Sequence, residues 1–287
     1  MVDLHMHTTY SDGTFSVKEL IELLNKENIR YASITDHNNV DAYIEFLENG
    51  LFNYFEGTMF PGTELQTIVD NKIIEILVYN YDLKFKKYVD DTRQQFWKFH
   101  EDSYRELINR AIALGLKVVE PQKEMQNGYY SNMKFQDALK SYLEYNKKIV
   151  DERIITDLLY FYRHEFQNPD SIFFVDNSKS FPKLDDLLYV AHECRGVTSL
   201  AHIDEYQSIE DKNAFLEYLS HDFNIDAIEC FHPVISESKR LKYIEFAECH
   251  GLMVSAGSDF HGPNVFERTN INTPASIKDV TILKKLL

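Results

Sequence analysis

From its first residues, this chain contains segments in which apolar residues recur every second position, as in strands, followed by segments in which they recur every three or four positions, as in helices. Apolar side chains occupy every second position of residues 2–7, which predicts a strand, and recur at helical spacing over residues 16–27. The helix would begin at a capping box formed by Ser16 and Glu19. A short apolar run over 31–35 predicts the next strand. A strand, a helix and a strand in such close succession are typical of α/β folds.

The same alternation continues through most of the chain. Strands are predicted where short apolar runs end at a polar residue, and helices where apolar residues recur every three or four positions. Further strands are predicted over 58–61, 72–79, 196–202, 225–233 and 252–257. Further helices are predicted over 40–49, 184–194, 209–221 and 236–250. A turn is expected from Pro61 to Glu64, directly after one of these strands.

Residues 83–180 break this alternation and follow helical spacing instead. Aromatic residues are mixed there with many charges, and residues 90–114 predict one long helix. Residues 134–165 predict two more helices. We therefore expect an inserted helical subdomain over 83–180, between the two parts of one α/β domain, 1–82 and 181–287.

The composition limits which substrates and partners the protein can be expected to bind. The formal net charge is −16, from 46 acidic and 30 basic residues, so the surface would repel long polyanions such as nucleic acids. A small phosphorylated substrate is compatible with this charge if metal ions supply positive charge locally. No apolar run is long enough to span a bilayer, and we expect neither a signal peptide nor a membrane partner. Three cysteines without C-x-x-C spacing favour reduced thiols and a cytoplasmic location.

Histidines and carboxylates gather where the predicted strands end, which is the edge at which α/β barrels and sheets place their sites. The eight residues of this set are His5, His7, Asp12, His37, Glu64, His202, Asp259 and His261. The set exceeds the needs of one tetrahedral ion and fits two or three ions that share bridging carboxylates. Nitrogen and oxygen donors without thiolate indicate Mn²⁺, Fe²⁺ or Zn²⁺. For His5 and His7 alone, a buried histidine pair without a metal is the alternative.

Two further polar residues lie within or at the end of predicted strands. Glu75 stands among apolar neighbours, where burial is costly unless the carboxylate is paired or bound to a metal. The alternative is an edge strand with Glu75 facing water. His232 ends a strand beside Pro233, and we expect it to contact the substrate.

These residues resemble the motifs of the polymerase-and-histidinol-phosphatase (PHP) phosphoesterases. The matching segments span nearly the whole chain in order. They are Asp3-Leu4-His5-Met6-His7-Thr8, Ser11-Asp12-Gly13, Thr35-Asp36-His37, Gly62-Thr63-Glu64, Leu200-Ala201-His202 and Gly257-Ser258-Asp259-Phe260-His261-Gly262. Within the family the chain is most similar to the nucleoside 3′,5′-bisphosphate phosphatases, which carry a helical insertion at the same place. Some members of that group also trim short RNA from the 5′ end.

The resemblance implies a distorted (β/α)₇ barrel with an inserted helical subdomain and a site for two or three metal ions. One ion would bind to His5, His7, Glu64 and Asp259. A second would bind to Asp12, His37 and His261, with Glu64 bridging, and a third to His202 and Glu75. Asp12 and His202 are also expected to be catalytic. Arg105 stands where the group often has an arginine that holds phosphate.

Two positions depart from the family pattern. Glu75 stands where the pattern has histidine, so it brings a negative charge that would alter metal preference or leave the third site empty. His202 is followed by Ile203-Asp204-Glu205 and not by the usual proline. Extra acids near the mouth of the site would disfavour a highly anionic substrate.

These features predict a metal-dependent phosphoesterase that hydrolyses a small phosphomonoester, a nucleotide or a short oligonucleotide, with metal-bound hydroxide as the nucleophile. A histidinol-phosphate phosphatase is the alternative enzyme, because it shares the barrel and the ligands. A non-catalytic metal-binding PHP domain is the alternative from another class, although the nearly complete ligand set argues against it. The long insertion favours the nucleotide-directed group.

Overall fold

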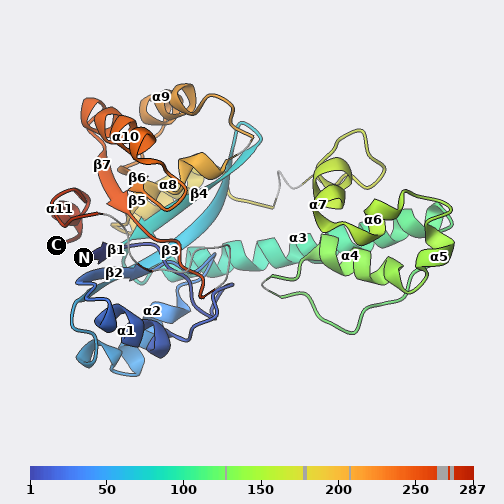
Figure 1. Cartoon of the computed structure of the whole chain (residues 1–287), viewed down its shortest axis with the longest axis horizontal. Coiled ribbons are helices and arrows are strands. Elements are labelled where there is room, and N and C mark those ends of the chain that lie inside the picture. Colours follow the sequence, from blue (N-terminus) through green and yellow to red (C-terminus); the bar gives the residue numbers. More distant parts are fainter. Residues whose placement is uncertain (127, 177–179, 207, 264–270, 272–274) are drawn as a thin grey trace. The chain divides into compact units, whose positions relative to one another are not determined.

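A computed structural model of the chain describes residues 1–126, 128–176, 180–206, 208–263, 271 and 275–287. These residues form two compact units, coloured by sequence in Figure 1. The first unit comprises Met1–Arg93 and Pro182–Leu287, and the second comprises Gln94–Phe181. The helix α3, Phe85–Ala113, passes from the first unit into the second, so this boundary falls within one continuous helix. The domain ranges expected from the sequence stay predictions.

The first unit is built on one seven-stranded sheet whose strands follow the order β1 to β7. The strands are β1 Val2–Asp3, β2 Tyr31–Ile34, β3 Thr58–Val69, β4 Lys72–Tyr79, β5 Val197–Leu200, β6 Ala227–Phe231 and β7 Met253–Ala256. Leu4 N donates a hydrogen bond to Ala256 O, and His7 N donates one to Phe260 O, each over 2.9 Å. These bonds join the segment after β1 to the segment that begins at the end of β7, so the sheet nearly closes into a barrel, as the resemblance to the PHP phosphoesterases implied.

Strand β4 runs antiparallel to both of its neighbours, whereas the other strand pairs are parallel. The hairpin between β3 and β4 turns at Asp70 and Asn71, whose φ angles of 46° and 59° are those of a primed turn. The expected turn from Pro61 to Glu64 is wrong, because these residues lie within β3.

Pro61 and Gly62 instead stand where β3 changes its pairing partner. Residues 58–61 pair with β2, and residues 62–69 pair with β4. A Cβ atom at position 62 would lie 2.0 Å from Ser33 Oγ, so only glycine allows β2 to approach so closely. The Pro-Gly signal therefore marks a change of strand partner and not a reversal of the chain.

Helices cover the outside of the barrel. They are α1 Val17–Lys26, α2 Asp41–Glu48, η1 Leu51–Asn53, α8 Leu184–Glu193, η4 Ile203–Glu205, α9 Lys212–Asp222, α10 Glu237–Cys249 and α11 Leu283–Leu286. Helix α1 begins at the predicted capping box, in which Glu19 N donates to Ser16 Oγ and Ser16 N donates to Glu19 Oε2. Figure 1 shows α10 beside β6 and β7, and α1 and α2 grouped below β2.

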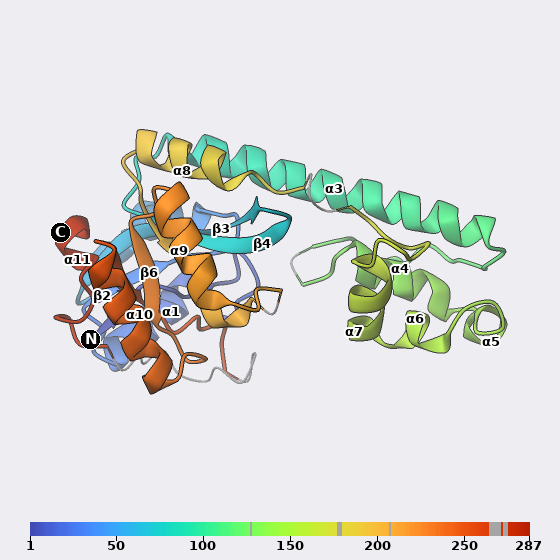
Figure 2. The ribbon, with the colours of Figure 1, turned by 90° about the horizontal axis from the view of Figure 1, so that it is seen from above.

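The second unit contains several short helices (Figure 2), which pack around a core rich in aromatic side chains. Its helices, besides the later part of α3, are α4 Ser131–Lys140, α5 Leu143–Asn146, α6 Glu152–Thr156, α7 Leu158–Phe161 and the π-helical turn η2 Tyr162–Phe166. The prediction of two helices over 134–165 is therefore wrong. Asp151 and Asp157 each restart the chain as a helix, because their carboxylates accept hydrogen bonds from the following backbone N–H groups.

The longer helices of the described residues carry charges along their length. Even α3, with 29 residues, mixes lysine, aspartate, arginine and glutamate with its aromatic residues. Within the described part of the chain, no helix is both long and apolar enough to cross a membrane.

Candidate metal centre

The segment after β1 supplies two histidines to the inside of the barrel. Leu4 and Met6 are fully buried in the apolar clusters, and His5 and His7 alternate with them. A Cβ atom at position 257 would lie 2.0 Å from His5 Cβ, so Gly257 permits the close approach of β7 to this segment. The alternation read from the sequence thus places both imidazoles, fully buried, at the centre of the barrel end.

Both imidazoles face the same two carboxylates. His5 Nε2 lies 3.2 Å from Glu64 Oε2 and 3.3 Å from Asp259 Oδ1. His7 Nε2 lies 3.4 Å and 3.0 Å from the same two oxygens. The four ligand atoms lie within 4.8 Å of one another, which suits bonds of about 2.0–2.2 Å to one ion.

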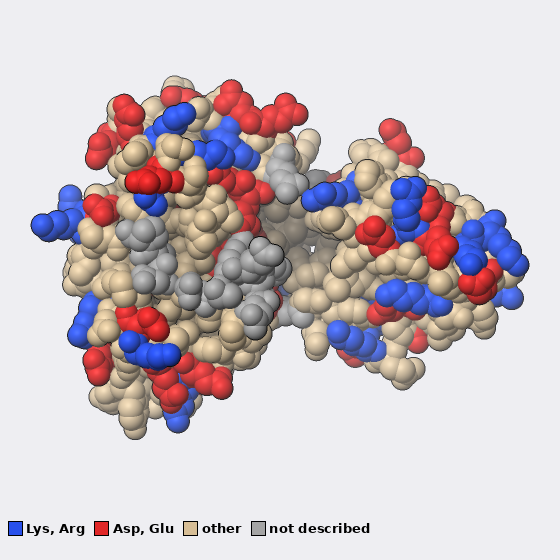
Figure 3. Space-filling view, in the orientation of Figure 1, with Lys and Arg blue, Asp and Glu red and all other residues tan. Residues whose placement is uncertain are grey.

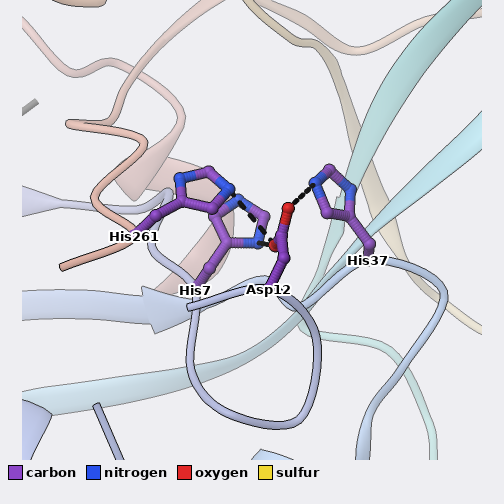
Figure 4. Close-up of side chains that lie close together, drawn as sticks. All are labelled: His7, Asp12, His37 and His261. Carbon is purple, nitrogen blue, oxygen red and sulfur yellow. Dashed lines mark ion pairs between the residues drawn. The ribbon is translucent and has the colours of Figure 1, made fainter. Parts of the chain in front are cut away.

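A second group forms around Asp12, whose carboxylate stands between three imidazole rings (Figure 4). Asp12 Oδ1 lies 3.3 Å from His261 Nε2 and 3.8 Å from His7 Nδ1. Asp12 Oδ2 lies 3.7 Å from His37 Nε2. The structure thus brings together the residues expected for the second ion and adds His7 to them.

A third group joins Glu75 to Glu64. His202 Nε2 lies 2.9 Å from Glu64 Oε1 and 3.3 Å from Glu75 Oε2. His37 Nδ1 lies 3.1 Å from Glu64 Oε2 and 3.8 Å from Glu75 Oε1. Strand β4 lies between β3 and β5, so the alternative of an edge strand with Glu75 facing water is wrong. Glu64 faces all three groups, which is the place of a bridging carboxylate.

The loop that carries Asp12 is held by a buried aspartate. Asp36 accepts hydrogen bonds from Thr8 N and Thr8 Oγ1, each over 2.7 Å, and from Ser11 Oγ over 2.6 Å. Three bonds to one charged group fix the loop more firmly than neutral bonds would. Asp36 therefore positions Asp12 without facing the cavity itself.

The nitrogen and oxygen atoms that converge in the cluster suit the binding of a cation. Five of them are buried and make no hydrogen bond within the described chain: His5 Nε2, His7 Nε2, Asp12 Oδ1, His37 Nδ1 and Glu64 Oε2. An unsatisfied buried polar atom costs about 1–3 kcal/mol, so five that converge indicate a bound ligand. They are nitrogens and oxygens without thiolate, as borderline divalent ions require.

The ionisation states of the two central carboxylates also suit metal binding. Burial would raise the pKa of Glu64, but His5, His37 and His202 hold that pKa well below its ordinary value. Burial also opposes ionisation of Asp12, yet His261, His37 and His7 lower its pKa. Both carboxylates are therefore ionised, which is the state in which a carboxylate binds a metal ion.

Two residues of the site were not among the metal ligands and substrate-binding residues predicted from the sequence. Glu229 on β6 is fully buried, and its carboxylate contacts His5 Nδ1 and accepts a hydrogen bond from His202 N over 2.9 Å. A glutamate among apolar residues was the available signal, the same one that drew attention to Glu75. Glu205 is the second, because it lines the cavity beside the ligands.

The two predicted substrate residues lie in different units. His232 is buried in the first unit, with Nε2 3.4 Å from Asp259 Oδ2. Arg105 lies on the part of α3 in the second unit, 69% exposed, with Nη1 3.2 Å from Asp102 Oδ1. Their roles in binding substrate stay predictions, as do the assignments of individual ligands to ions.

A nearly closed seven-stranded barrel with this cluster at its end defines the class as metal-dependent hydrolases built on an α/β barrel. The family described as PHP domain matches residues 3–222, and the chain belongs to that family. The comparison thus confirms the resemblance seen in the sequence motifs.

Relatives of known name or structure extend this comparison. The chain is 24% identical over 265 residues to the 5′-3′ exoribonuclease Rnm of Escherichia coli K12, covering 91% of this chain and 85% of that protein. An amidohydrolase structure from Chromobacterium violaceum, with bound sulfate and no metal, matches with a TM-score of 0.68 and 19% identity, over 99% of this chain and 95% of that one. A Bifidobacterium adolescentis protein named as a candidate metal-dependent phosphoesterase matches with a TM-score of 0.65 and 18% identity, over 99% and 94%. At 19% and 18% identity, the similarity to these two structures shows a shared fold and does not by itself show a shared activity.

Proposed function

We propose that this protein hydrolyses a small phosphomonoester, either a nucleotide or a short oligonucleotide, as a metal-dependent phosphoesterase. The observation that carries the proposal is the set of five buried ligand atoms without a hydrogen bond, three of them on residues that line one cavity, in a chain that belongs to the PHP family. The exoribonuclease Rnm is a relative across most of both chains, which supports a substrate that contains a nucleotide.

The donor set supports two or three divalent ions, with Mn²⁺, Fe²⁺ or Zn²⁺ as candidates. The three overlapping groups around His5, Asp12 and Glu75 share Glu64 or His7, as expected for neighbouring ions with common ligands. When bound, such ions supply the Lewis-acid charge that activates water and neutralises phosphate oxygens.

The side chains of the cavity have distinct tasks in this proposal. The Asp12 side chain is 24% exposed, so its carboxylate can accept a hydrogen bond from water that enters the cavity. His202 faces the cavity opposite the Asp12 loop and would orient the phosphoryl group. His232 and Arg105 are assigned to the substrate. No side chain is required as a covalent nucleophile.

The surface supports a small substrate better than a long nucleic acid. The net charge is −16. On the face shown in Figure 3, basic and acidic side chains are intermingled over each unit, and the described residues form no continuous basic patch there. A protein that tracks a long phosphate backbone needs such a patch.

The test is a screen of the metal-replete protein against phosphoesters. The panel contains adenosine 5′-monophosphate, a 5′-phosphorylated RNA trinucleotide and histidinol phosphate. We expect kcat/KM for a nucleotide substrate to exceed that for histidinol phosphate at least about tenfold, because the latter lacks a nucleoside. Faster hydrolysis of histidinol phosphate would favour the alternative enzyme. A metal-loaded protein inert toward the whole panel would favour a non-catalytic domain.

A further inference from the structure

One side chain of the cavity has no task in the proposed reaction. Eight residues of the described chain line this cavity of about 170 Å³, and seven of them are predicted metal ligands. Those seven are Asp12, His37, Glu64, Glu75, His202, Asp259 and His261. The eighth is Glu205, a half-buried carboxylate at the border between the cavity and solvent.

The backbone beneath Glu205 is firmly anchored. Glu205 ends the short helix η4 and donates its N–H to His202 O over 2.8 Å. Its neighbour Asp204, with a side chain only 6% exposed, accepts a hydrogen bond from Tyr243 Oη over 2.8 Å and forms an ion pair with Lys239 Nζ at 3.1 Å. Both donors lie on α10, so η4 is fixed to that helix and Glu205 is held in place.

Glu205 is grouped with Asp259 and His232. Asp259 Oδ1 faces His5 and His7, whereas Asp259 Oδ2 faces His232 Nε2 at 3.4 Å. Ligand atoms of Glu205, His232 and Asp259 lie within 4.8 Å of one another. The Glu205 carboxylate is thus next to the reacting centre and also next to a predicted substrate residue.

The size and charge of the cavity indicate what meets this carboxylate. Pockets that enclose a whole small ligand measure about 300–1,000 Å³. In the proposed reaction a cavity of about 170 Å³ would hold the phosphoryl group, and the alcohol part of the substrate would lie at the mouth. An ionised carboxylate at the mouth accepts hydrogen bonds from hydroxyl groups and repels a second phosphate.

We propose that Glu205 is a specificity-determining residue that selects a phosphomonoester with a hydroxyl-bearing leaving group and disfavours one with a second phosphate. A nucleoside 5′-monophosphate with free ribose hydroxyls is the matching substrate class. This inference rests on the proposed phosphatase function. It adds that the preferred leaving group carries hydroxyl groups and no second phosphate.

The test compares adenosine 5′-monophosphate with adenosine 3′,5′-bisphosphate as substrates. Glu205→Gln removes the charge and keeps the shape, and Glu205→Asp keeps the charge. Glu237→Gln removes the same charge from an 81% exposed position at the start of α10 and serves as the matched control. The ratio of kcat/KM for the monophosphate over the bisphosphate should fall about tenfold in Glu205→Gln, and should hold in the other two variants.

Two measurements independent of turnover complete the test. Calorimetry should show that Glu205→Gln binds adenosine 3′-monophosphate, the product of bisphosphate hydrolysis, several-fold more tightly than the wild type does. Elemental analysis should show unchanged metal content. An unchanged substrate ratio and product affinity, or a loss of metal in Glu205→Gln, would overturn the inference. If the wild type hydrolyses neither nucleotide, the calorimetry still tests Glu205, and the RNA trinucleotide of the substrate panel decides the proposed function.

Discussion

Glu229 Oε1 lies 3.0 Å from His5 Nδ1, and both side chains are fully buried. A carboxylate at this distance accepts a hydrogen bond from Nδ1–H. The lone pair of the ring is then on Nε2, which here points toward Glu64 and Asp259. Carboxylates behind metal-binding histidines fix the ring and its tautomer in this way. Glu229 would thus hold His5 in the orientation and tautomer that bind a metal ion through Nε2.

Replacing Glu229 should weaken metal binding while leaving the ligands in place. Glu229→Gln is expected to lower the affinity for Zn²⁺ or Mn²⁺ about 10–100-fold, because an amide binds His5 Nδ1 more weakly and can favour the wrong tautomer. Titration of the metal-free protein measures this, with Glu22→Gln on the exposed face of α1 as control. Wild-type affinity in Glu229→Gln would show that the contact has no influence on the centre.

His7 faces ligands of two groups, so its loss should disable the centre as a whole. His7→Ala is expected to reduce phosphatase activity at least about a thousandfold, while the circular dichroism spectrum stays that of the wild type. His221→Ala, at an 87% exposed position on α9, is the matched histidine control. Full activity in His7→Ala would rule out the proposed site.

Asp36 should contribute to stability more than an aspartate at the surface. Asp36→Ala leaves Thr8 N, Thr8 Oγ1 and Ser11 Oγ without their charged acceptor, at a cost of about 2–4 kcal/mol in the free energy of unfolding. Urea denaturation of the metal-free protein measures this cost. Asp91→Ala, at a 62% exposed position, should change stability by no more than about 0.5 kcal/mol. Equal effects of the two substitutions would contradict the role given to Asp36.

The second unit should lose stability in mild acid. Burial lowers the pKa of His100 from 6.5 to about 4. Between these pH values the imidazole therefore binds a proton in the unfolded chain but not in the folded unit. This contribution is complete above pH 6.5 and is lost as the pH falls toward 4, amounting to about 2 kcal/mol between pH 7 and pH 5. Trp97, the only tryptophan, lies 6.1 Å from the His100 ring and reports the unfolding.

His100→Gln supplies the comparison for this pH dependence. The variant has no imidazole to titrate, so the difference in unfolding free energy between pH 7 and pH 5 should shrink by about the same amount. The absolute stability of the variant does not enter this comparison. A pH dependence identical to that of the wild type would show that His100 is not the titrating group.

The sequence predicted those parts of the site that depend on local periodicity. The alternation over residues 2–7 placed His5 and His7 together, and the structure puts both beside Glu64. Closure of the barrel depends on contacts between distant segments, such as Leu4 with Ala256, which no local pattern contains. Glu229 was missed for the same reason, since its partner His5 is 224 residues away.

Local signals failed where one pattern has two structural meanings. Pro61-Gly62 is typical of turns, but here it marks the point at which β3 changes from β2 to β4 as its partner. Helical spacing over 134–165 continues through Asp151 and Asp157, although each aspartate caps a new short helix. In the first case the arrangement is decided by the neighbouring strands, and in the second by capping hydrogen bonds within the segment.

The central claim is that the converging histidines and carboxylates form a catalytic metal centre. The most direct measurement removes all metal from the purified protein with a chelator and follows nucleotide hydrolysis while one divalent metal is added back, with bound metal counted by elemental analysis. We predict no activity without metal and full activity once at least two equivalents per chain are bound. Undiminished activity in the metal-free protein, or no activity with the centre fully loaded, would contradict the account.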